Sequence, residues 1–326
     1  MKILQALSHL LSRYTAPFVI AVAIITYFFP GLFSWVRGTR QTVILGIIMF
    51  GMGLTLTTDD FKVLAKRPLD IFIGAVAQYT VMPFLAFGLV HLLRLPNEIA
   101  IVLLLVGCCP GGVSSNIMSY LCHGDVPFSV GMTTASTLLS PIVTPALMLL
   151  LAGERIDVPA FGMFVSICGV VLAPVILGFL INTYCGKNAT FKEIRPLMPG
   201  VSVIGLAMIV GGVIAAQGSH FFTSGLLIFV AVLLHNGLGY LLGYIAGVIT
   251  GMNKAKKRTI SIEVGMQNAG LATNLAMTHF AALPQAALIS AVSCVWHSIS
   301  GTILAGFFAW LDTRREKKLA TGKTAR

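Results

Sequence analysis

The chain has 326 residues, of which 56% are hydrophobic and only 10% are charged, and its mean hydropathy is +0.90. Soluble domains of this length carry more charge, so the composition excludes a soluble protein and predicts an all-α polytopic membrane protein. The formal net charge of +11 is compatible with a nucleic-acid partner, but the positions of the charges, given below, argue against one.

An apolar run of about 20 residues crosses a bilayer as a helix, and we count ten such runs, joined by short loops. The segment before the first is a short amphipathic lead-in without the cleavage site of a signal peptide. The predicted spans, numbered 1 to 10, are residues 16–36, 41–58, 69–93, 98–122, 126–152, 158–182, 197–217, 223–250, 259–280 and 284–311.

The basic residues are distributed unequally between the two sides of this predicted bundle. Eighteen of the 22 Lys and Arg residues fall on the side of the N-terminus, and the other side receives only Arg37, Arg40, Arg94 and Arg155. Cytoplasmic loops are enriched in Lys and Arg, so both termini are predicted to be cytoplasmic. The basic tail, residues 312–326, is predicted to anchor the last helix at the cytoplasmic surface and not to bind nucleic acid.

Two polar, glycine-containing stretches interrupt apolar spans. Residues 106–116 in span 4 and residues 264–274 in span 9 align without a gap and are identical at four of eleven positions. Each break lies in the fourth span of a five-span half, so residues 1–152 and 158–311 are predicted to be inverted repeats, an architecture of secondary transporters. Glycines alone would favour close helix packing, but the amides and hydroxyls beside them favour a binding site.

Glu263 is the only acidic residue well inside a predicted span. A carboxylate there costs roughly 3 kcal/mol on insertion scales, and no Lys or Arg lies inside any predicted span, so the predicted partner is a bound cation. Gln78 and Asn236 could reach a break from spans 3 and 8. The polar groups in and near the breaks offer the hard oxygen ligands of Na⁺: Ser115, Asn116, Ser129, Thr133, Glu263, Gln267 and Asn268.

The sequence gives weaker support to three other functions: a proton-coupled carrier, a membrane enzyme, and an efflux carrier or channel. A proton relay would use several titratable groups, and we expect His235 and His297 to be hydrogen-bonded structural residues. A membrane enzyme could use Cys108, Cys109 or His297, but no nucleophile and base stand at an interpretable spacing, and the two cysteines are predicted to be packing residues. An efflux carrier or channel, such as an arsenite-type exporter, differs in the direction and sodium dependence of its flux.

Residues 107–116, 129–139 and 263–268 together resemble the signature motifs of the bile acid:sodium symporter family. The resemblance runs from about span 2 to span 10. It implies a panel of spans 1, 2, 6 and 7 and a core of spans 3–5 and 8–10, in which spans 4 and 9 cross at their breaks. It also implies a sodium-coupled symporter in a bacterial-type inner membrane, which imports an organic anion, bile-acid-like or a small carboxylate such as pantoate, by alternating access.

The resemblance further implies two sodium sites beside the crossing. No obligate protein partner is evident from the sequence. Asn268 would face the substrate, while Val113 stands where relatives often have Thr, which puts a substrate hydrogen bond in doubt. The first site would consist of Ser115, Asn116, Ser129, Thr133 and Glu263. The second would consist of Gln78, Glu263 and Gln267 with the backbones of Val264 and Met266.

Overall fold

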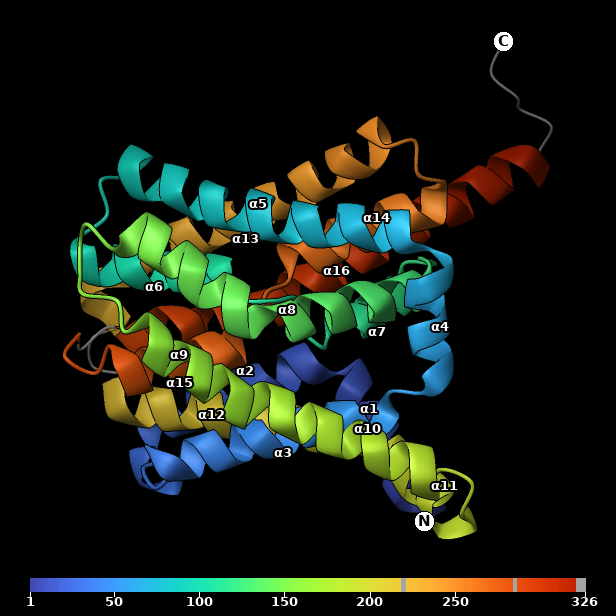
Figure 1. Cartoon of the computed structure of the whole chain (residues 1–326), viewed down its shortest axis with the longest axis horizontal. Helices are drawn as coiled ribbons and strands as arrows, with labels where there is room; N and C mark the ends of the chain where they lie inside the picture. Colours follow the sequence, from blue (N-terminus) through green and yellow to red (C-terminus); the bar gives the residue numbers. More distant parts are fainter. Residues whose placement is uncertain (218–220, 284–285, 321–326) are drawn as a thin grey trace.

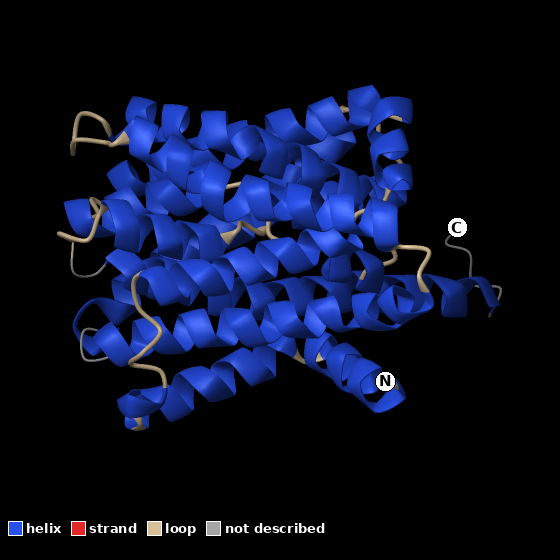
Figure 2. Cartoon of the chain, turned by 60° about the horizontal axis from the view of Figure 1, so that its bottom comes forward, coloured by secondary structure: helices blue, strands red, loops and turns tan. Residues whose placement is uncertain are grey.

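The computed structural model describes residues 1–217, 221–283 and 286–320, which are almost entirely helical (Figures 1 and 2). Short 3-10 turns (Pro30–Leu32 and Arg195–Leu197) and a π-helical turn (Cys168–Leu172) complete the described structure. The α-helices are α1 (Lys2–Arg13), α2 (Thr15–Phe28), α3 (Thr39–Thr55), α4 (Thr58–Lys66), α5 (Pro68–Leu92), α6 (Asn97–Cys108), α7 (Ser115–Leu121), α8 (Val126–Ala152), α9 (Ala160–Ile167), α10 (Ala173–Cys185), α11 (Ala189–Ile194), α12 (Met198–Gln217), α13 (Phe221–Ile249), α14 (Lys254–Gly265), α15 (Ala269–His279) and α16 (Ala286–Ala320).

Not every predicted span is one long helix. Among the described residues, six helices are long and apolar enough to cross a membrane alone, or up to seven if the bent pair α1–α2 forms one span. The other predicted spans are short or broken: α3 has 17 residues, and spans 4 and 9 are each divided in two. Span 1 was predicted to reach residue 36, but α2 ends at Phe28 because Pro30 and Gly31 follow it.

The helical interruptions fall inside the two polar stretches. Helix α6 ends at Cys108 and α7 begins at Ser115, while α14 ends at Gly265 and α15 begins at Ala269. Pro110 cannot donate a backbone hydrogen bond, and Asn268 accepts from the backbone N–H of Leu271 at 3.0 Å, which caps the first turn of α15. Proline thus removes a helical donor in one break, and a side-chain cap starts a new helix in the other.

The helices pack in two groups (Figure 1). Helix α12 packs on α2 and α3, and α10 packs on α3. The second group includes α5, α6, α8, α13, α14 and α16, with α7 packed on α8, α14 and α16 and with α15 packed on α16. The groups meet where α12 and α2 contact α16 and where α15 contacts α3. This interface contains the second break, because α15 is the helix that follows it.

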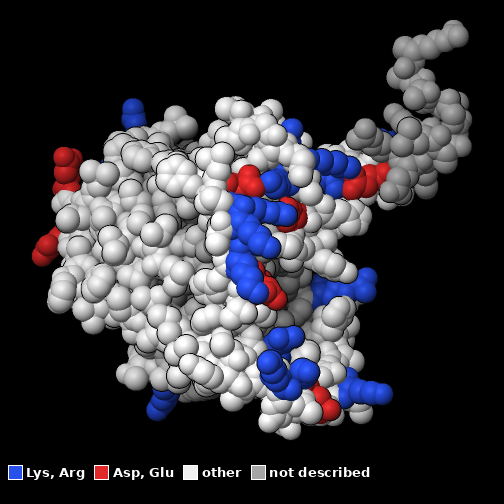
Figure 3. Space-filling model, turned by 45° about the vertical axis from the view of Figure 1, so that its right-hand side comes forward, with Lys and Arg blue, Asp and Glu red and all other residues white. Residues whose placement is uncertain are grey.

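Lys and Arg side chains gather at the end of the molecule where α4 and the start of α14 lie (Figure 3). Helix α14 begins five residues before the predicted span and includes Arg258, which is 3% exposed. Arg258 was predicted to lie in the loop before span 9, and the structure instead places it, buried, within α14. Arg258 hydrogen-bonds both carboxylate oxygens of Asp312 on α16, at 2.6 and 2.9 Å. Its charge is paired there, and it is not the partner of Glu263.

Candidate cation site and adjoining cavity

The two breaks lie side by side and pair through their backbones. The N–H of Gly112 donates to the carbonyl of Met266 at 2.7 Å, and the N–H of Asn268 donates to the carbonyl of Pro110 at 2.8 Å. These bonds satisfy groups that lost their helical partners and that lipid cannot satisfy. The contact requires glycine at position 112, where a Cβ atom would lie 2.8 Å from the carbonyl oxygen of Gln267. The sequence motif therefore brings the two breaks into direct contact.

Glu263 lies at the end of α14, 1% exposed, and accepts hydrogen bonds from three hydroxyl groups. Ser115 on α7 donates at 2.6 Å, Thr133 on α8 donates at 2.8 Å, and Ser129 on α8 also donates. Asn116 joins the group because its Oδ1 accepts from Ser129 at 2.8 Å. The structure thus brings together all five residues expected for the first sodium site, from three different helices.

The residues expected for the second site form a neighbouring group. Gln78 on α5 donates to Oε1 of Gln267 at 2.7 Å, and Gln267 donates to the carbonyl of Val264 at 2.9 Å. The carbonyl of Met266 already accepts from Gly112. In the described hydrogen bonds, Glu263 is joined to the first group and not to Gln78 or Gln267. Four of the five expected residues therefore lie together, while sharing of Glu263 between the sites stays a prediction.

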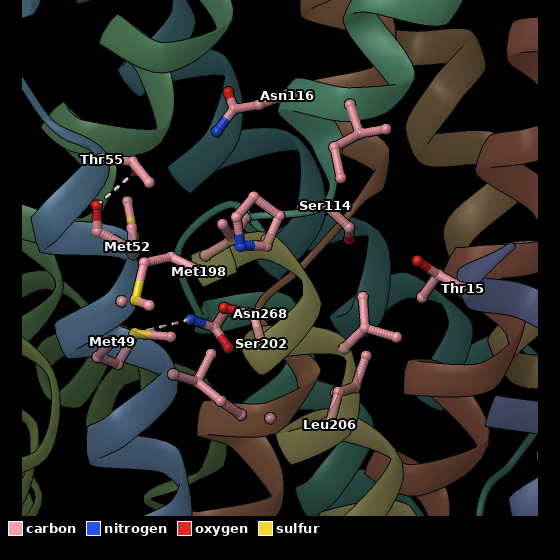
Figure 4. Close-up of a pocket in the computed structure, with 18 of the residues that line it drawn as sticks. Thr15, Met49, Met52, Thr55, Ser114, Asn116, Met198, Ser202, Leu206 and Asn268 are labelled. Carbon is pink, nitrogen blue, oxygen red and sulfur yellow. Dashed lines mark hydrogen bonds between the residues drawn. The ribbon is translucent and has the colours of Figure 1, made fainter. Parts of the chain in front are cut away.

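A cavity of about 330 Å³ opens beside the paired breaks, between α2, α3 and α12 on one side and α7, α15 and α16 on the other. Both residues expected to face the substrate, Val113 and Asn268, line it. In Figure 4, the amide nitrogen of Asn268 points across the cavity to Met49 of α3, whose sulfur lies 3.9 Å away. Among the described residues that line the cavity there is no Lys or Arg, and Asp60 is the one acidic residue.

The cavity also contains residues that the sequence analysis did not place in a site. Ser202 of α12 and Thr15, the first residue of α2, lie in its wall (Figure 4). His297 of α16 also lines it, and neither ring nitrogen has a hydrogen-bond partner among the described residues. The expectation of a hydrogen-bonded structural histidine is therefore wrong for His297. It is confirmed for His235, whose Nε2 lies 3.0 Å from the carbonyl of Met82.

The structure also tests the predictions for Asn236 and for the cysteine pair in span 4. Asn236 of α13 does reach the second break, where it donates to the carbonyl of Gly265 at 2.7 Å. Cys108 and Cys109 are fully buried and unpaired beside the first break, and both belong to the main apolar core, as expected of packing residues.

Residues 42–224 match the model of the sodium bile acid symporter family. The chain belongs to this family. It is 45% identical over 325 residues to the "Uncharacterized sodium-dependent transporter YocS" of Bacillus subtilis. This alignment covers 100% of this chain and 99% of the relative. It is 43% identical over 279 residues to the "Probable sodium/metabolite cotransporter BASS1, chloroplastic" of Oryza sativa, and 44% identical to the Arabidopsis thaliana protein of the same name. These alignments cover 86% of this chain and 68% and 69% of the two relatives.

Family membership confirms the resemblance found in the motifs and identifies a membrane protein from a family of sodium-dependent transporters. The bacterial and plant relatives are named as a sodium-dependent transporter and as probable sodium/metabolite cotransporters. The predicted class of function, sodium-dependent symport, is therefore the class of the family.

Proposed function

We propose that this chain is a sodium-coupled symporter that imports a small organic anion by alternating access. The observation that carries the proposal is the buried Glu263 carboxylate, which lies among hydroxyl and amide oxygens at a paired helix break, with a cavity on the other side of that break. A carboxylate without a basic partner at membrane depth is a candidate ion-coupling group, and the relatives are named as sodium-dependent transporters or sodium/metabolite cotransporters.

The first group of residues supports binding of one sodium ion. Each hydroxyl that now donates to Glu263 has two lone pairs. Rotation of the Ser115, Ser129 and Thr133 hydroxyl groups would turn these lone pairs toward a cation held by the carboxylate and by the Oδ1 of Asn116. The ligands are all oxygens, which suit Na⁺ better than zinc or copper. The same side chains would thus stabilise the carboxylate before the ion arrives and coordinate the ion afterwards.

A second sodium ion is proposed at the neighbouring group. Gln78 and Gln267 each have an amide oxygen, and the backbone carbonyls of Val264 and Met266 lie where α14 ends. Unwound carbonyls and the C-terminal end of a half-helix are common sodium ligands in transporters. Glu263, at the end of the same half-helix, would supply the negative charge for both ions.

The cavity supports a small organic anion with an apolar part. Methionine and leucine side chains form much of its wall, and the substrate would find polar partners in Asn268 and His297. The described lining contains no Lys or Arg, so the bound sodium ions would supply the positive field, aided by the N-terminus of α15. Because Val113 has no hydroxyl group, a substrate hydrogen bond at that position would be replaced by these other donors.

The transport cycle is proposed to follow the arrangement that the family resemblance implies. Ten spans would form a five-plus-five inverted repeat with both termini in the cytoplasm of a bacterial-type inner membrane. The core of spans 3–5 and 8–10 would move against the panel of spans 1, 2, 6 and 7. The position of the cavity between the two packed groups of helices supports this division.

A thermal-shift screen of small carboxylates tests the proposal directly. In sodium, a transported carboxylate is expected to raise the melting temperature of the purified protein, because ligands that bind the folded state stabilise it. In potassium, the same carboxylate is expected to have little effect, because its affinity is linked to bound sodium. Carboxylates that stabilise the protein equally in the two salts would contradict sodium coupling.

Removal of one oxygen ligand is expected to weaken sodium binding more than folding. Thr133→Ala and Gln267→Ala should each raise the sodium concentration for half-maximal uptake by about tenfold, the effect of losing about 1.4 kcal/mol of binding free energy. High sodium should then partly restore uptake in both variants. The measurement is the sodium dependence of initial uptake in proteoliposomes.

Two matched controls accompany these variants. Thr134→Ala removes a neighbouring buried hydroxyl on α8, and Gln41→Ala removes another buried amide. Neither wild-type side chain has a hydrogen-bond partner among the described residues. Both controls should keep the normal sodium dependence. If Thr133→Ala and Gln267→Ala behave like their controls, the two residues are packing groups and not ligands.

A further inference from the structure

Helix α1 has three different faces. Ser8 and Ser12 are buried. Three residues at the helical spacing i, i+4 and i+7 lie on one side of α1 and form what we call the apolar face: Ile3, Leu7 and Leu10, each 49–84% exposed. Tyr14, which directly follows the helix, is also exposed. Three polar residues at the spacing i, i+7 and i+11, all exposed, form what we call the polar face: Lys2, His9 and Arg13.

The buried Ser8 attaches α1 to the turn before α12 and to the start of α12, while the Ser12 hydroxyl donates to the carbonyl of Ser8 within α1. The Ser8 hydroxyl donates to the carbonyl of Pro196 at 2.9 Å and accepts from the N–H of Gly200 at 3.0 Å. Glycine is needed at position 200, because a Cβ atom there would lie 2.8 Å from the Cα of Ser8. Gln5 adds a bond of 2.9 Å to the carbonyl of Glu193. The helix is therefore held in a defined position, with its polar contacts on the inside.

This position leaves the apolar face uncovered by the described residues of the chain. Helix α1 bends by 81° from α2, and in Figure 2 the helix at the N-terminus lies at the lower edge of the molecule, outside the packed bundle. A helix in water would bury its apolar face and expose its serines, and α1 does the reverse. Its environment on that side must therefore be apolar.

We propose that α1 is an interfacial helix, whose apolar face lies in the lipid at the membrane surface that carries the basic loops. Three features indicate that lipid, and not protein, covers the apolar face. The polar face lies beside the apolar one, as in helices that lie in the plane of the membrane. Lys2 and Arg13 place a positive charge at each end of the helix, suited to anionic headgroups. Helix α1 also contacts α2 and α12, which belong to candidate membrane spans.

Binding of α1 to the membrane surface would also position one wall of the cavity, whether or not sodium binds at the proposed sites. Thr15, the first residue of α2, lines the cavity and donates to the carbonyl of Ser12 in α1 at 2.9 Å. Helix α1 is thus joined to α2 and α12, which form one wall of the cavity. By binding the membrane surface, α1 holds that wall at a fixed depth while the other group of helices moves.

Tryptophan depth measurements on the full chain in liposomes test this inference. The background is Trp35→Phe, Trp296→Phe and Trp310→Phe, which replaces every native tryptophan. Leu7→Trp places a single probe on the apolar face, and His9→Trp places one on the polar face of the same helix. Lipids with brominated acyl chains should quench Leu7→Trp several-fold more strongly than His9→Trp, since an interfacial helix sinks about 5–10 Å.

Each other outcome overturns the proposal. Strong quenching of Leu7→Trp by aqueous iodide would place the apolar face in water. Equal quenching of the two probes by brominated lipid would show that the two faces of α1 lie at the same depth, which an interfacial helix does not allow. A Leu7→Trp probe that is shielded from both quenchers would be covered by protein, such as a second copy of this chain.

A second measurement avoids the loss of the native tryptophans. In nanodiscs of phosphatidylcholine and phosphatidylglycerol, Leu7→Glu in the otherwise unchanged chain should speed amide hydrogen exchange in residues 2–13 by about tenfold or more. His9→Glu, on the polar face, should leave the exchange unchanged. Unchanged exchange in Leu7→Glu would also overturn the proposal.

Discussion

Replacement of Glu263 by glutamine is expected to abolish sodium-dependent uptake and to leave the protein folded. Glutamine keeps the shape of the side chain, and the hydroxyl groups of Ser115, Ser129 and Thr133 can accept hydrogen bonds from its amide as readily as they donate to the carboxylate. The variant nevertheless removes the formal negative charge from both proposed ion sites. Sodium affinity should fall at least about 100-fold, the equivalent of about 2.8 kcal/mol.

The measurements are uptake in proteoliposomes and the sodium-dependent shift of the melting temperature. Glu263→Gln should melt at or above the wild-type temperature without sodium, because it no longer buries a charge, and added sodium should not raise that temperature. Glu154→Gln, which changes an exposed carboxylate at the end of α8, should behave as wild type. Normal sodium-driven transport by Glu263→Gln would show that the ion-site assignment is wrong.

Uptake of a monoanion is expected to respond strongly to membrane voltage. Two sodium ions and one monoanion carry one net positive charge inward. That charge gains about 2.3 kcal/mol per 100 mV of inside-negative potential, which corresponds to about a 40-fold change in the accumulation ratio. In liposomes with a potassium diffusion potential set by valinomycin, sodium-driven accumulation should rise by this order when the interior is negative.

The control is the same preparation with equal potassium on both sides, where no diffusion potential exists. Accumulation there should depend on the sodium gradient alone. Uptake that ignores the voltage would require one coupled sodium ion or a dianionic substrate, and the proposed stoichiometry of two sodium ions per monoanion would be wrong.

The sequence was most informative about residues whose chemistry conflicts with a membrane span. Glu263, Pro110 and the amides beside them stand out in apolar segments, and the structure places both breaks together at these residues. Serine and threonine are common in membrane helices, so the residues alone indicated Ser115, Ser129 and Thr133 as possible oxygen ligands, and only the family motifs assigned them to one site. The hydrogen bonds to Glu263 bring these residues together independently of the resemblance.

The far wall of the cavity could not be predicted in the same way. Met49, Met198 and Ser202 come from α3 and α12, and nothing in their local sequence distinguishes a cavity wall from a lipid-facing or packed helix. His297 was misjudged because a sequence does not indicate whether a ring nitrogen finds a partner, which depends on helices distant along the chain. Span lengths were overestimated where a proline or glycine ends a helix early, as at Pro30.

The reciprocal hydrogen bonds between the breaks also impose an order on biogenesis. While the ribosome is still synthesising the second half, Gly112 and Pro110 have no partner, because Met266 and Asn268 do not yet exist. At about 5–20 residues per second, this interval lasts roughly 10–30 s. During that time the first break needs water, the translocon or a chaperone to satisfy its backbone. The first half is therefore expected to be unstable when expressed alone and to be rescued by co-expression of the second half.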